Sequence, residues 1–175
     1  MKKVLMLVVV IMATLSVSAQ DMYLGGGISL WRNDDLNTTS FSVTPEIGVN
    51  LSSKWAIGGE LGFAHAKYSK DDITLKSNAF AIAPYARYSF YENKVVRLFI
   101  DMGMGFSTIK VKDADSTNGF EIGLKPGIAI KLNNSFSLVS KLGFAGYRDD
   151  YYKGDNGFGV SFDTENISLG ILYSF

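Results

Sequence analysis

The stretch SFSVTPEIGVNL at residues 40–51 alternates apolar and polar side chains at almost every position. Phe41, Val43, Ile47 and Leu51 fall on one face, and small or polar residues lie between them. A period of two residues is typical of a β-strand with two different faces, whereas an amphipathic helix repeats about every 3.6 residues. The stretch therefore predicts a strand with one apolar and one polar face.

The same alternation recurs along the rest of the chain. Further strands are expected near residues 22–31, 55–63, 79–90, 96–106, 120–131, 136–144 and 166–175. The facing of the first strand stays open, because it contains three successive glycines. Short polar turns are expected near 52–54, 92–94 and 133–135, and longer connections near 32–38, 67–76, 110–117 and 148–164. Eight antiparallel strands joined in this way predict an all-β, up-and-down barrel.

The apolar face carries more bulk than the inside of such a barrel can hold. An eight-stranded interior has room for packed side chains or one small ligand, as in a lipocalin. The other face carries mainly Gly, Ala and Ser with a few charges, which suits a narrow lumen. We therefore expect the apolar face to meet lipid. Aromatic residues then form two girdles: Phe41, Phe63, Phe80, Phe106, Phe120 and Phe144 at the long-loop ends, and Trp55, Phe90, Phe136, Tyr173 and Phe175 at the short-turn ends.

Three prolines, Pro45, Pro84 and Pro126, fall inside predicted strands. Because proline cannot donate a backbone hydrogen bond, each should leave a bulge or a missing bond in its ladder. Residues 45–64 also align with residues 126–145, and both duplication of a four-stranded half and convergence of similar hairpins explain this repeat.

The N-terminus has the features of an export signal. Two lysines precede the apolar stretch 4–17, and small residues follow up to Ala19. This apolar stretch is shorter than the roughly 18 residues of a membrane-spanning helix, so we expect a signal peptide that is cleaved after Ala19. The expected organisation is a signal peptide at residues 1–19 and a barrel domain at residues 20–175.

Composition excludes several classes of site. The chain has 17 basic and 17 acidic residues, and loss of residues 1–19 would remove two lysines, so the mature chain would be slightly acidic. Nothing in this balance indicates nucleic-acid binding. The absence of cysteine excludes disulfides, thiolate metal sites and a lipidated cysteine. No cofactor and no metal ion are expected.

These features together resemble the small eight-stranded outer-membrane β-barrel proteins of the OmpX/OmpA type, the outer membrane protein β-barrel domain family. The resemblance covers the whole mature chain and includes the terminal tripeptide Tyr173-Ser174-Phe175. It implies a transmembrane barrel in the bacterial outer membrane, in contact with its lipid. It also implies that the barrel-insertion machinery recognises Tyr173 and Phe175.

The polar face carries acids and bases in nearly equal numbers. Charges in a confined lumen are costly unless they are paired, so we expect an ion-pair network that fills the barrel. A narrow ion path is the functional alternative. The expected lumen network comprises Glu46, Glu60, Arg87, Arg97, Asp101, Glu121, Lys125 and Lys141, with Lys131 on the same face.

No catalytic motif accompanies these charges. His65 is the single histidine and is expected to face outward near a loop, where an interfacial role is favoured over a catalytic one. Basic residues in the long loops could hold the phosphates of lipopolysaccharide. We therefore expect a non-enzymatic integral barrel that serves envelope integrity or surface interaction through its extracellular loops. The alternatives are a narrow pore or hydrophobic-solute transporter and, third, a lipid-modifying rim enzyme. No feature fixes an oligomeric state.

Overall fold

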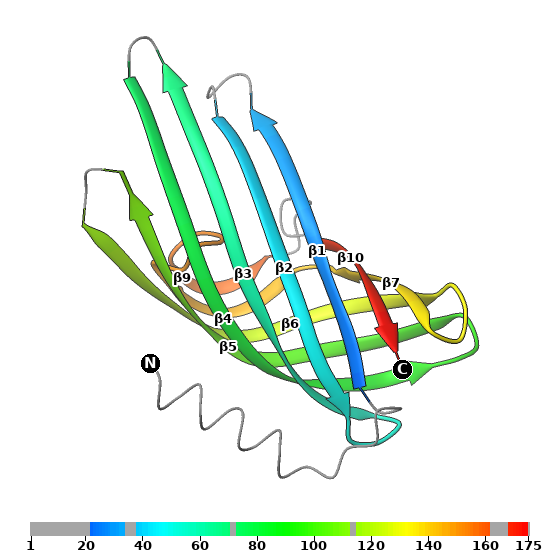
Figure 1. The fold of residues 1–175 in the computed structure, drawn as a ribbon. Helices are drawn as coiled ribbons and strands as arrows, with labels where there is room; N and C mark the ends of the chain where they lie inside the picture. The colour runs from blue at the N-terminus through cyan, green and yellow to red at the C-terminus, as the bar shows by residue number, and fades with distance from the viewer. Residues whose placement is uncertain (1–21, 34–37, 71–72, 113–114, 162–167, 175) are drawn as a thin grey trace.

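The computed structural model describes residues 22–33, 38–70, 73–112, 115–161 and 168–174, and the expected signal peptide and Phe175 lie outside these ranges. In this part of the chain the regular elements are strands (Figure 1). They are β1 (Met22–Asn33), β2 (Thr38–Asn50), β3 (Trp55–Lys70), β4 (Ile73–Glu92), β5 (Val96–Val111), β6 (Ser116–Lys131), β7 (Phe136–Lys141), β8 (Phe144–Asp149), β9 (Gly157–Ser161) and β10 (Ser168–Ser174). None of the described segments is a helix long and apolar enough to cross a membrane.

The strands close into one antiparallel barrel. Strands β1 to β6 pair with their neighbours in chain order, and β1 also pairs with β10. Both β7 and β8 pair with β6, while β10 pairs with β7 and β9 pairs with β8. The segment β7–β8 therefore takes the place of one strand, and β9–β10 takes the place of another. The predicted all-β, eight-stranded, up-and-down barrel is confirmed.

All three prolines disturb a ladder, as predicted. The register between β2 and β3 skips Pro45, and the register between β4 and β5 skips Pro84. Opposite Pro126, the segment β7–β8 contains one more residue than β6 between the paired positions Lys141 and Ala145. This is a β-bulge, and it forms beside a residue that has no backbone N–H to offer.

The bulge reverses the facing of every later side chain in that strand, because side chains alternate with a period of two. Phe144 was expected in the outer aromatic girdle, and this prediction is wrong. Its side chain is 5% exposed and lies against Gly123 inside the barrel. Arg148, which was expected in a long loop, is also turned into the lumen and is buried. An unbroken alternation cannot anticipate either placement.

The outer surface carries the two predicted aromatic girdles, apart from Phe144, which faces inward, and Phe175, which lies outside the described residues. Between them lie exposed apolar side chains such as Leu61, Met104 and Leu124. The first strand, whose facing was open, turns Tyr23 inward and Leu24 outward. Four ring pairs mark the girdles, with centroid distances of 5.2 Å for Phe63–Phe80, 5.3 Å for Phe106–Phe120, 4.8 Å for Trp55–Tyr88 and 4.9 Å for Phe136–Tyr173.

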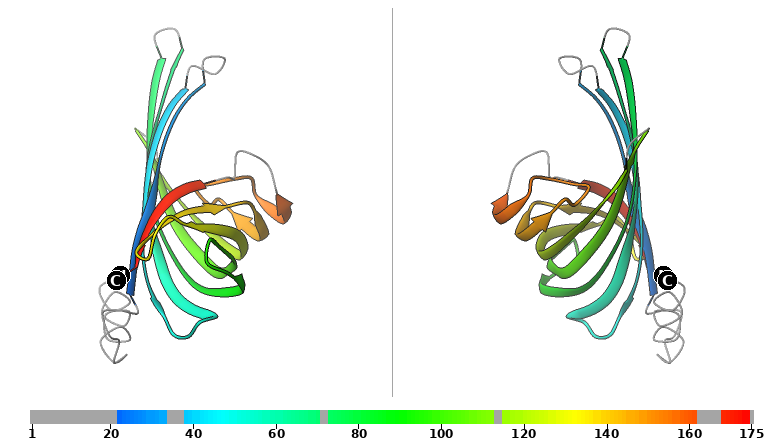
Figure 2. Two further views of the ribbon diagram at one scale, coloured as in Figure 1. Left: turned by 90° about the vertical axis from the view of Figure 1, so that its right-hand side faces the viewer. Right: turned by 90° about the vertical axis from the view of Figure 1, so that its left-hand side faces the viewer.

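The barrel is much taller on one side than on the other. Figure 2 shows β1 to β4 standing as a high wall, while β8 and β9 end lower on the opposite side. The ladder between β3 and β4 continues to the pair Lys70 and Ile73, so most of the segment 67–76 is strand. Similarly, β5 reaches Val111. The prediction of long loops at 67–76 and 110–117 is therefore wrong, because most of these residues extend the strands. Their side chains are mostly polar, so the sequence shows no alternation of apolar and polar residues there.

Candidate functional site in the barrel lumen

Arg87 on β4 is the centre of the main cluster of charges in the lumen. Its side chain is buried, with 3% of the residue exposed. The guanidinium Nε donates to Asp101 Oδ1 at 2.6 Å, and Nη2 donates to Asp101 Oδ2 and to Glu46 Oε1, each at 2.9 Å. Arg87 and Asp101 lie opposite each other in the β4–β5 register, so the fork-like contact follows directly from strand pairing.

Lys141 joins this cluster from the far wall of the barrel. Its Nζ donates to Glu60 Oε2 at 2.7 Å and to Glu46 Oε2 at 3.0 Å, and it lies 3.6 Å from Asp101 Oδ2. Glu46 and Glu60 are themselves register partners on β2 and β3. Two carboxylates side by side would repel each other, and the single ammonium group between them offsets this repulsion.

Aromatic side chains pack around these charges. The hydroxyl of Tyr85 donates to Glu46 Oε1 at 2.7 Å and is bonded to the Tyr23 hydroxyl at 2.8 Å. The ring of Phe99 lies under the Arg87 guanidinium at 4.1 Å. Glycine makes room for these rings: a β-carbon at Gly48 would lie 2.2 Å from the Tyr23 hydroxyl oxygen. Tyr23, Tyr85 and Phe99 were not among the sequence candidates, although alternation from Arg87 and Asp101 places Tyr85 and Phe99 on the same face.

A second cluster lies nearer the long-loop end. Glu121 on β6 is 1% exposed and accepts hydrogen bonds from Lys125 Nζ at 2.5 Å and from Arg148 Nε at 3.0 Å. The Arg148 guanidinium lies 3.8 Å from the ring centroid of Phe144. Both of these residues face inward because of the bulge. Sequence reasoning missed Arg148, since its inward position depends on one extra residue earlier in the strand.

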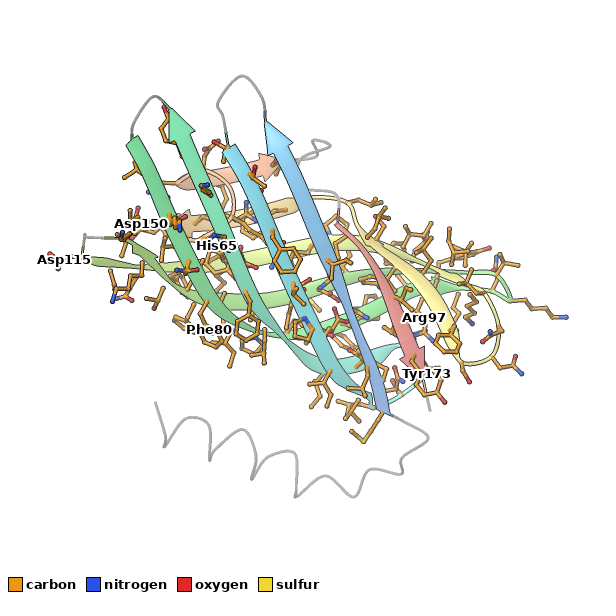
Figure 3. The ribbon with its side chains drawn as sticks, turned by 45° about the horizontal axis from the view of Figure 1, so that its top comes forward. His65, Phe80, Arg97, Asp115, Asp150 and Tyr173 are labelled. Carbon is orange, nitrogen blue, oxygen red and sulfur yellow. The ribbon has the colours of Figure 1, made fainter. Side chains whose placement is uncertain are left out.

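Arg97 does not join either cluster, and its expected place in the central network is corrected. It lies near the start of β5, and its Nε donates to Glu92 Oε2 at 3.0 Å. Lys131 also pairs with Glu92. Figure 3 shows Arg97 and Tyr173 toward one end of the barrel, and His65 and Asp150 toward the other. Alternation gave the correct face of the strand but not the partner of Arg97. The group of Arg97, Lys131 and Glu92 lies at the rim and is partly exposed.

Among the described residues, the charged side chains at the centre of the lumen are buried and closely packed. Two small cavities, of about 30 and 20 Å³, border Glu60 and Lys141, and each has room for only one or two water molecules. Among the described residues, no buried side-chain nitrogen or oxygen lacks a hydrogen-bond partner. The arrangement is that of a paired network, in which seven of the eight candidate side chains take part: Glu46, Glu60, Arg87, Asp101, Glu121, Lys125 and Lys141.

The other candidate residues lie on the outer surface or outside the described ranges. His65 is exposed, and its Nδ1 is 2.8 Å from the Asn78 side-chain oxygen. The Tyr173 ring packs at a tilt against the ring of Phe136, while Phe175 is not described, so the expected insertion signal stays a prediction. Within the described segments, no three His, Asp or Glu side chains gather as they would around a metal ion.

Comparison with known proteins agrees with this architecture. No curated protein matches the chain. The crystal structure of Ail, the attachment invasion locus protein of Yersinia pestis, is similar with a TM-score of 0.51 and 17% sequence identity, over 89% of this chain and 97% of that one. The backbone structure of Yersinia pestis Ail in a phospholipid bilayer nanodisc covers 89% of this chain and 99% of that one, with 16% identity and a TM-score of 0.49. At 17% identity the likeness to the crystal structure shows the fold alone.

The family model decides the assignment. The model described as the outer membrane protein beta-barrel domain matches residues 4–175. A transmembrane barrel needs an apolar outer band between aromatic girdles and a polar interior, and the structure has both. The chain therefore belongs to the outer membrane protein β-barrel domain family and is an integral β-barrel, in contact with lipid, of the bacterial outer membrane.

Proposed function

We propose that this barrel is non-enzymatic and serves surface interaction, with envelope integrity as its second role, through its extracellular hairpins. The tall wall of β1 to β4 carries this proposal. Beyond the girdle pair Phe63 and Phe80, the β3–β4 ladder continues through seven further residue pairs. At about 3.3 Å per residue this is roughly 23 Å of paired strand past the girdle. A barrel that only spanned the membrane would not need this extension.

The lumen supports the same proposal. Paired charges and rings fill the interior, which is the arrangement expected of a scaffold rather than of a wide channel. On the outer surface the partner of His65 is the amide of Asn78, which cannot act as an acid or a base. These two observations favour surface interaction over transport and over catalysis.

The base of the wall also suits the phosphates of lipopolysaccharide. Lys67 on β3 and Lys76 on β4 are register partners directly opposite each other. Lys110, on the next strand β5, is paired with Asn78 of β4. All three lysines are exposed, just beyond the aromatic girdle. Like charges on facing strand positions repel each other, and a phosphate group between them would turn that repulsion into charge-assisted hydrogen bonds. We include lipopolysaccharide among the proposed partners on this basis.

Shortening the wall tests the proposal. A variant in which a two-residue turn replaces residues 67–76 should assemble normally, because the pairs it loses lie outside the membrane. Cells that carry it should lose most of the adherence to surfaces that the intact protein confers. Heat-modifiable migration on gels reports assembly, and counting attached cells reports adherence. Unchanged adherence by a correctly assembled short variant would remove the surface-interaction role.

Point variants at the lysines separate the lipid partner from the surface role. Replacing Lys67 and Lys76 with alanine should weaken lipopolysaccharide binding at least about tenfold, since a hydrogen bond to a charged group contributes about 1.5–3 kcal/mol. Alanine at Lys94, in the short turn on the periplasmic side, is the matched control. Envelope integrity is measured in cells that carry either variant, by their sensitivity to detergent. Equal binding by the wall and control variants would exclude this lysine pair as the lipid contact.

A further inference from the structure

The connection between β8 and β9, residues 150–156, folds into the extracellular mouth of the barrel rather than away from it. Tyr151 is 6% exposed. The ends of the loop are clasped, because the backbone N–H of Asp150 donates to Asn156 Oδ1 at 2.8 Å and Asn156 Nδ2 donates to Asp150 Oδ1 at 2.8 Å. Asp150 has a φ of 48°, a left-handed conformation that turns the chain inward at this point.

The two tyrosine rings of this loop occupy sockets lined by small residues. A β-carbon at Gly105 would lie 2.6 Å from the Tyr151 hydroxyl oxygen, and one at Gly62 would lie 2.5 Å from the Tyr152 hydroxyl oxygen. The two rings also pack against each other, with centroids 4.9 Å apart. The tyrosine hydroxyls can occupy these sockets because the barrel wall has glycine at both positions. The loop and the wall are therefore sterically fitted to each other.

Polar contacts hold the loop in the mouth. The backbone N–H of Tyr152 donates to Ser107 Oγ at 3.1 Å, and Lys153 Nζ lies 3.9 Å from Glu60 Oε1. Glu121 interacts with the Tyr151 hydroxyl. Burial is the main reason why the pKa of the Tyr151 phenol is raised, so this hydroxyl stays protonated and remains a donor. The loop therefore contacts Glu60 and Glu121, the acids of the lumen network that lie nearest to it.

We propose that residues 150–156 are a stopper for the extracellular mouth, and that the sockets become a binding pocket for small phenols when the stopper is withdrawn. Residues 150–156 lie outside the strand ladder, which resumes at the pair Arg148 and Gly157, so local opening can withdraw them without unpairing the barrel. The filled network below them stays in place, so withdrawal exposes a blind pocket rather than a channel. A ring-sized hole with a carboxylate acceptor matches a phenol in shape and in hydrogen bonding.

A single cysteine can report on the stopper, because the chain contains none. Ala81 is 2% exposed. Its β-carbon borders the space beside Gly62 that the Tyr152 ring occupies. In an Ala81→Cys protein on intact cells, a charged, membrane-impermeant thiol reagent should react slowly. Adding Tyr151→Gly and Tyr152→Gly should make the reaction at least about tenfold faster. An unchanged rate in the folded double-glycine protein would overturn the stopper.

Three controls keep the experiment decisive. Tyr147→Gly removes an exposed tyrosine from the outer face of β8 and should leave the labelling slow. Phenylalanine at both Tyr151 and Tyr152 keeps the rings and should also leave it slow. Asn156→Ala opens the clasp without touching the barrel wall, so it should accelerate labelling even if the double-glycine variant does not fold. Slow labelling of a folded Asn156→Ala protein would count against the stopper.

The pocket is tested in the same assay with p-cresol, which is the side chain of tyrosine as a free molecule. At millimolar concentration, p-cresol should slow the labelling of the double-glycine variant back toward the rate of the intact loop. Toluene, which lacks the hydroxyl, should protect less. Faster labelling that p-cresol does not slow would overturn the phenol pocket, while the stopper itself would stand.

Discussion

Replacing Arg87 with alanine should lower the free energy of unfolding by about 3–5 kcal/mol, the typical result of removing one partner from a buried ion pair. The loss would be large because Asp101 and Glu46 would both remain buried, with only Lys141 to compensate for their charge. Urea unfolding of the protein in lipid vesicles, with tryptophan fluorescence as the signal, measures this difference.

Arg97→Ala is the matched control, since it removes the same side chain from the partly exposed rim. The partly exposed pair of Arg97 with Glu92 is of the kind that contributes about 0–1 kcal/mol. The free energy of unfolding of the Arg97→Ala protein should therefore hardly change. If the two variants lost equal stability, the central cluster would not be a buried network of paired charges.

Replacing Leu124 with arginine should cost about 2–4 kcal/mol, the range measured for a cation at the lipid-facing midplane of a barrel. Leu124 is exposed on the outer face of β6, between the aromatic girdles, and pairs with Met102 on β5. The same unfolding experiment measures the effect. Leu132→Arg introduces the same charge into the short turn after β6, where about 0–1 kcal/mol is expected. Equal costs at the two positions would mean that this face does not meet the membrane.

The period-two alternation predicted the fold because it shows whether each side chain faces the lipid or the lumen. It placed Arg87, Asp101, Glu46 and Lys141 on the inner face. Strand pairing sets Arg87 opposite Asp101, and closure of the barrel brings Glu46 and Lys141 to them across the lumen. The internal repeat adds one detail, since Glu60 and its equivalent Lys141 meet across the lumen at 2.7 Å. Local pattern was sufficient for these residues.

Three features could not be predicted, each for a physical reason. Pro126 predicted a bulge or a missing bond, but nothing in the alternation shows that the extra residue lies on the partner segment β7–β8, which shifts Phe144 and Arg148 by one position. Arg97 pairs with Glu92, which was expected in the short turn at 92–94 and instead ends β4, so the sequence pattern did not indicate this partner. Tyr151 sits in a charged loop without periodicity, so its place in the mouth of the barrel follows from contacts with distant strands.

The conductance of the purified protein in a planar bilayer tests the account most directly. Arg87, Lys141 and their acids pair across the lumen of an eight-stranded barrel, whose interior has little room beyond its own side chains. We therefore predict no stable conductance from the intact protein. Steady ion currents, with a selectivity that changes when Asp101 is replaced by asparagine, would contradict the account and show that the barrel is a pore.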